Sequence, residues 1–181
     1  HARQYFLFLF MFKNPVVRYS LWGAFLVVLY FAAFYAAGKS LFIHPFVQWA
    51  SLLIYALCMY ATVQADMAQN GPHRDFRALL RPPFIVFLLI NIAYWLFFYG
   101  LHLADPELVQ MEMTAQIAHL RSQLEHGTGD PQQANQLREQ LQALEQAPPV
   151  MPLGPVILRM ALGSIGGFGL SAAIVAVSRP S

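Results

Sequence analysis

Long apolar runs dominate the pattern of hydrophobic and polar positions along this chain. Residues 19–37, 46–65 and 84–104 contain no Asp, Glu, Lys or Arg, and neither does 160–178, which is rich in Gly, Ala and Ser. A helix of about 20 mostly apolar residues crosses the hydrocarbon core of a bilayer. The pattern therefore predicts an all-α membrane protein with four transmembrane helices, of which the fourth lies in 150–181 and is followed by a short inner tail.

Two shorter segments lie before and between these spans. Residues 1–18 hold an apolar run too short to cross the bilayer, which predicts an N-terminal interfacial segment or, alternatively, an extension of the first span. In the loop 66–83, residues 75–81 predict a short amphipathic helix at the interface, with two arginines toward lipid phosphates and Phe76, Leu79 and Leu80 toward acyl chains. The pair Pro82-Pro83 is then expected to begin the third span.

Residues 105–149 carry a different pattern. Asp105-Pro106 and Asp130-Pro131 each combine an N-cap acid with proline at the first helical position. Apolar residues then recur at spacings of three and four, which indicates two helices with narrow apolar seams. We expect an antiparallel extramembrane hairpin whose partner-contact residues are Met113, Ile117, Leu120, Leu124, Leu137, Leu141 and Leu144.

Composition and charge exclude several classes of protein and predict how the chain is oriented in the membrane. The chain is 57% hydrophobic and 11% charged, which excludes a soluble enzyme domain, a disordered chain and a nucleic-acid binder. With the N-terminus inside, seven Lys and Arg lie on the inner side and three on the outer side. The positive-inside rule then predicts both termini in the cytoplasm and the hairpin on the outer side.

Arg159 is the charged residue closest to hydrocarbon, and Asn91 is an amide within a predicted span. Arg159 is expected to form an interface ion pair with Asp105 or to extend its charge toward water, and a ligand or proton role is the alternative. Asn91 lies near the centre of the third span, where an amide needs a partner. An interhelical hydrogen bond is the main interpretation, and a contact in a polar pore is the alternative.

Small residues recur every four positions in the last span, at Gly163, Gly167 and Ser171. Such a stripe lets another helix approach closely. The partner is either another span of this chain or another subunit, and the sequence leaves both open.

No pattern for catalysis or cofactor binding stands out. The single cysteine excludes a disulfide framework and a cysteine-based zinc site, and the histidines lack the spacing of a haem or metal site. We therefore expect no catalytic residue, cofactor or metal. A minor interpretation is acid–base chemistry at the outer surface through His102, Asp105 and Glu107.

The layout resembles an uncharacterised family of four-span bacterial membrane proteins, mainly of Bacteroidetes type, known as a domain of unknown function. The resemblance rests on the stretch 11–15 before the first span, the Gln69-Asn70-Gly71 turn, residues 75–77, and Asp105-Pro106-Glu107 before an acidic helical insertion. It implies a multi-pass protein of the bacterial cytoplasmic (inner) membrane and carries no site residues.

These features favour a non-enzymatic accessory or scaffold subunit of a larger membrane complex. Its expected partners are membrane lipids and other membrane protein subunits, with no nucleic acid. The alternative is a small homo-oligomeric transporter or channel, in which Asn91 and Arg159 line a path.

Overall fold

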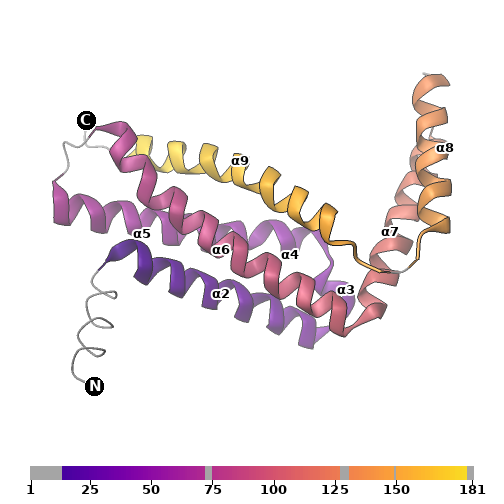
Figure 1. Ribbon diagram of the computed structural model, residues 1–181, viewed down its shortest axis with the longest axis horizontal. Helices are drawn as coiled ribbons and strands as arrows, with labels where there is room; N and C mark the ends of the chain where they lie inside the picture. Colours follow the sequence, from indigo (N-terminus) through magenta and orange to yellow (C-terminus); the bar gives the residue numbers. More distant parts are fainter. Residues whose placement is uncertain (1–13, 72–74, 127–130, 149, 179–181) are drawn as a thin grey trace. The chain divides into compact units, whose positions relative to one another are not determined.

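The computed structural model describes residues 14–71, 75–126, 131–148 and 150–178, and within these ranges the chain is all-helical, without a strand (Figure 1). The helices are α2 (Pro15–Ala37), α3 (Lys39–Phe42), α4 (Pro45–Ala50), α5 (Leu52–Asn70), α6 (Phe76–Ala104), α7 (Pro106–Glu125), α8 (Pro131–Gln146) and α9 (Leu153–Ser178). The chain divides into two compact units, of which one comprises residues 1–98 and 153–181 and the other Tyr99–Pro152.

Four helical segments are long and apolar enough to cross a membrane. They are Pro15–Ala37, Pro45–Asn70, Phe76–Ala104 and Leu153–Ser178. The expectation of a multi-pass, all-α membrane protein with four candidate spans is therefore confirmed at this level.

The first span begins at Pro15, four residues earlier than the apolar run predicts. Asn14 explains the difference, because its Oδ1 accepts a hydrogen bond from the backbone N–H of Val16 at 2.9 Å. An Asn N-cap followed by proline is a standard helix start. Residues 14–18 thus belong to the helix start, and the rest of the expected interfacial segment lies outside the described residues.

The third span differs from the expectation at its N-terminal end. α6 runs without interruption from Phe76 to Ala104, with Pro82 and Pro83 inside it, so there is no separate interfacial helix. Leu79 is 1% exposed and packs with Val63 and Val175. The expectation that Leu79 faces acyl chains is therefore wrong, because contacts with α5 and α9 cover that face of α6.

The first unit, residues 1–98 and 153–181, holds the four candidate spans up to Phe98 of α6 and is called the four-helix unit below. Close approach of its helices and aromatic packing hold it together. A Cβ on Gly23 of α2 would overlap the Ile90 side chain of α6 and would lie 3.2 Å from the Cys58 Sγ of α5. Near the other end of α2, the Phe31 ring lies 5.8 Å from that of Phe42 and 4.9 Å from that of Tyr94. α5 also packs against both α2 and α9.

The second unit contains the C-terminal end of α6 together with α7 and α8, which pack against each other. Asp105 caps α7, as its Oδ1 accepts from the Glu107 N–H at 3.2 Å. The Arg121 guanidinium reaches Glu145 of α8 at 2.7 Å. The cap predicted at Asp130 lies outside the described residues.

Candidate functional site

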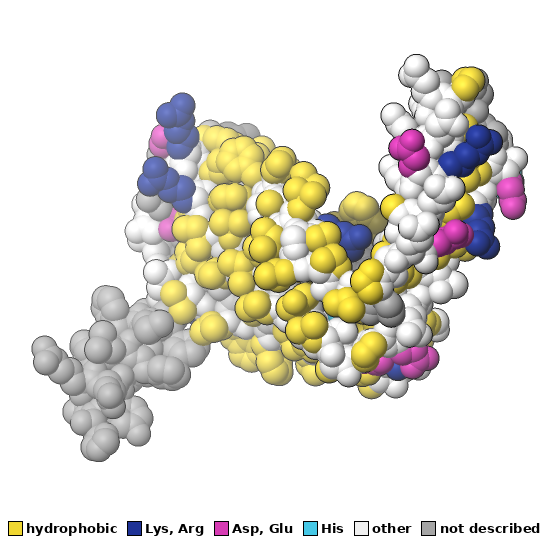
Figure 2. Space-filling model, turned by 45° about the vertical axis from the view of Figure 1, so that its right-hand side comes forward, with side chains coloured by type: hydrophobic (Ala, Val, Ile, Leu, Met, Phe, Trp, Pro, Cys, Tyr) yellow, Lys and Arg dark blue, Asp and Glu magenta, His cyan; other side chains and the backbone are white. Residues whose placement is uncertain are grey.

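A groove in the four-helix unit is the main candidate site. It has a volume of about 510 Å³ and runs between α4–α5 and α9, with α6 contributing to its lining. Its lining includes Gln48, Trp49, Asn91, Trp95, Arg159 and Gly166. Hydrophobic side chains cover most of the visible surface of this unit (Figure 2).

Contacts between helices show which end of the groove is polar and which is apolar. At one level, the Tyr94 hydroxyl of α6 donates to Gln48 Oε1 at 2.7 Å. About two helical turns away, the Phe87 ring lies 5.2 Å from that of Tyr55. Since α4, α5 and α9 run in one direction and α6 in the other (Figure 1), the groove is polar where α9 begins and apolar further along.

Among the described residues, Arg159 is the only charged one in the lining of the groove. It lies six residues after Leu153, about 9 Å into α9. The Arg159 guanidinium forms no hydrogen bond or ion pair with the described residues of the four-helix unit. Asp105 belongs to the other unit, so the expected Arg159–Asp105 ion pair stays a prediction.

Asn91 joins α6 to α9. Its side chain is nearly buried, and its Nδ2 donates to the backbone carbonyl of Met160 at 3.2 Å. A Cβ on Gly163 would lie 3.7 Å from the same Nδ2. The amide therefore makes an interhelical hydrogen bond, and the small residue beside it allows the two backbones to come close.

The small-residue stripe of α9 faces the chain's own helices. Gly167 is buried, and a Cβ there would overlap the Phe87 ring of α6. Ser171 is fully buried, and its hydroxyl donates to the Gly167 carbonyl at 2.7 Å. The sequence left open whether this stripe packs on another span or on another subunit. In the structure it packs on another span of the same chain. Gly166, by contrast, has no heavy atom within 4 Å of a Cβ position, apart from its own helix backbone.

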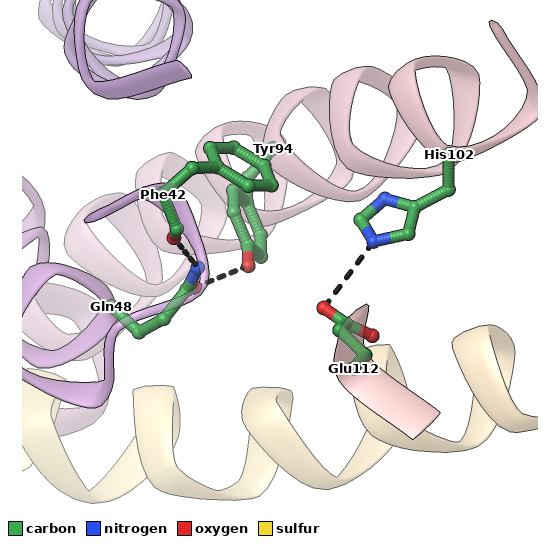
Figure 3. Close-up of polar contacts among 5 residues, drawn as sticks. All are labelled: Phe42, Gln48, Tyr94, His102 and Glu112. Carbon is green, nitrogen blue, oxygen red and sulfur yellow. Dashed lines mark hydrogen bonds and ion pairs between the residues drawn. The ribbon is translucent and has the colours of Figure 1, made fainter. Parts of the chain in front are cut away.

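Gln48 is a polar residue of the groove that was not singled out from the sequence. It accepts from Tyr94, and its Nε2 donates to the Phe42 carbonyl at 2.9 Å, so it bridges the end of α3 and α6 (Figure 3). The signal that would have found it is an amide inside an apolar run, the same signal that marked Asn91.

His102 and Glu112 form a pair within the second unit. His102 Nε2 lies 3.3 Å from Glu112 Oε1, and the imidazole is almost fully buried (Figure 3). The acid–base cluster expected from the sequence combined His102 with Asp105 and Glu107 instead. Asp105 caps α7, and Glu112, which lies on the same helix, is a carboxylate found within 4 Å of His102.

Among the described residues, no group of three His, Cys, Asp or Glu side chains is placed to hold a metal ion. Comparisons with protein-family models, with curated proteins and with solved structures find no match to this chain. The family resemblance therefore stays a prediction.

Proposed function

We propose that the protein is a non-enzymatic accessory or scaffold subunit of a larger bacterial inner-membrane complex, which it contacts through the α7–α8 hairpin. The observation that carries this proposal is the incomplete burial of the hairpin seam. All seven seam residues (Met113, Ile117, Leu120, Leu124, Leu137, Leu141 and Leu144) are only half-buried.

The two helices of the hairpin cover only part of each other. α8 has no buried residue, and α7 buries only Leu108 and Val109, next to its N-terminus. Short helices gain most of their stability from packing an amphipathic face, so a seam that is only half-buried in water leaves room for further packing. An amphipathic helix of a partner that packs along the seam would bury the part of it that α7 and α8 leave exposed.

The proposal places the hairpin on the outer side of the membrane and both termini in the cytoplasm, following the distribution of Lys and Arg. Cys58 is the only cysteine and is buried in α5, so Cys58→Ser gives a background for labelling. A Gln136→Cys variant in intact cells should react with a membrane-impermeant maleimide. Labelling only after cell lysis would contradict this topology.

Purification in mild detergent, followed by mass spectrometry of the co-migrating proteins, tests the partner. We expect a stoichiometric partner that Leu120→Asp/Leu124→Asp releases. The matched control is Ala118→Asp/Ser122→Asp, which places the same charges at the same spacing on exposed positions of α7. Equal release by both variants, or a partner that survives the first one, would count against the proposal.

A second candidate is a homo-oligomeric transporter or channel. It is favoured by one observation, namely that Asn91 and Arg159 line the same groove. Solute flux into proteoliposomes that is lost with Asn91→Leu would support this candidate. A protein that runs as a monomer and carries no flux would remove it.

A further inference from the structure

We infer that the groove between α4–α5 and α9 binds one anionic phospholipid, with its phosphate at Arg159 and an acyl chain along the glycines of α9. The site lies in the leaflet in which α9 begins. This inference concerns the four-helix unit alone and does not depend on the proposed contacts of the hairpin.

The polar end of the groove has the chemistry of a headgroup site. Arg159 supplies its only charge and has no hydrogen-bond or ion-pair partner among the described residues of its unit. Guanidinium groups bind phosphate through paired, charge-assisted hydrogen bonds. Trp49 and Trp95 line the same groove, and tryptophan is enriched at the level of lipid headgroups.

The rest of the groove fits a hydrocarbon chain. Gly166, Gly167 and Leu170 line it along α9, and Tyr55 and Phe87 line it along α5 and α6. The distance along α9 from Arg159 to Leu170 is about 16 Å, which is about half of the ~30 Å hydrocarbon core. A charged end and an apolar channel one leaflet deep together match a lipid that enters from that leaflet.

Gly166 has no side chain, and this leaves room for the acyl chain of the lipid. Gly167, its neighbour, packs on Phe87, whereas Gly166 faces open space and lines the groove. Gly169 also faces open space but does not line the groove. The chain therefore provides a matched pair, because Gly166→Leu fills the groove and Gly169→Leu adds the same side chain outside it.

The test counts bound lipid by native mass spectrometry. The full-length protein is mixed in detergent with equal amounts of phosphatidylglycerol and phosphatidylcholine that have identical acyl chains. We expect one retained lipid per chain and a preference for phosphatidylglycerol of about fivefold, the effect of one basic residue near anionic lipid. Arg159→Gln should abolish the preference and Arg159→Lys should keep it. Arg81→Gln, an arginine of α6 outside the groove, should change nothing.

The groove variants separate this site from general lipid adhesion. Gly166→Leu should remove most of the retained lipid of both kinds, and Gly169→Leu should leave it unchanged. Equal retention by the two glycine variants would overturn the inference, as would a wild-type protein without preference or a preference that survives Arg159→Gln. Release of a protein partner by Gly166→Leu, with bound lipid unchanged, would also overturn it, because the groove would then hold a helix of another chain.

Discussion

The four-helix unit and the α7–α8 hairpin differ in what their exposed apolar surface means, if the hairpin lies outside the membrane as proposed. Large side chains such as Phe25, Leu57 and Ile165 are 58%, 69% and 71% exposed in the four-helix unit, yet lipid covers such surfaces at no cost. In the hairpin, the seam leucines are better covered, but what remains uncovered faces water under the proposed topology. Under that topology, exposed apolar surface leaves a site for a protein partner in the hairpin, whereas lipid covers it in the four-helix unit.

The two units also differ in what holds their helices together. Lipid supplies no hydrophobic force between spans, so α9 is held to α6 by close packing at Gly167 and by the hydrogen bond of Asn91. The hairpin relies on a periodic apolar seam, supplemented by the surface pair Arg121–Glu145. Substitutions should therefore act on each unit by a different mechanism.

Gly167→Leu should have the largest effect. Its side chain would overlap the Phe87 ring, and overpacking typically costs about 1–3 kcal/mol. The expected result is a lower thermal midpoint in detergent, measured by the loss of monodisperse protein on heating. Gly169→Leu is the control, and an equal loss with both variants would show that α9 does not pack on α6 at Gly167.

Leu141→Asp should destabilise the hairpin alone. Loss of a half-buried leucine from the seam costs about 1 kcal/mol, and the charge adds to that. Proteolysis should cut α8 faster while the spans keep their thermal midpoint. A matched drop in the midpoint of the spans would mean that the two units do not fold independently.

Asn91→Leu should weaken the four-helix unit by about 0.6 kcal/mol, the average for a hydrogen bond between membrane helices. The reason is the loss of its bond to the Met160 carbonyl. The equilibrium between folded and unfolded states in mixed micelles of SDS measures this difference. A variant that is more stable than the wild type would show that Asn91 does not serve stability. That result would favour the transporter interpretation, in which Asn91 lines a solute path.

Arg121→Ala should change the stability of the hairpin by about 0.5 kcal/mol or less. The Arg121 and Glu145 side chains are 60% and 39% exposed, and ion pairs at such exposure contribute little. Amide exchange of α7 and α8 should stay within a few-fold of the wild type. A much larger acceleration would show that the pair, and not the seam, holds the two helices together.

The sequence predicted what depends on local pattern. Run length marks the four spans, and the residues at spacings of three and four in α7 and α8 are half-buried. The continuity of α6 through Pro82 and Pro83 was missed, because contacts of Leu79 with α5 and α9 override the local helix-start signal. The pairs Gln48–Tyr94 and His102–Glu112 were missed because they depend on where helices meet, which no spacing in one segment encodes.

Amide hydrogen exchange of the purified protein in nanodiscs, without any partner, tests most directly whether the hairpin is incomplete. The account predicts protection factors of about 30 or less along α7 and α8, which corresponds to an opening free energy of about 2 kcal/mol. Protection there of about 10,000 or more would show that the two helices are stable on their own, and the half-buried seam would then give no reason to expect a partner.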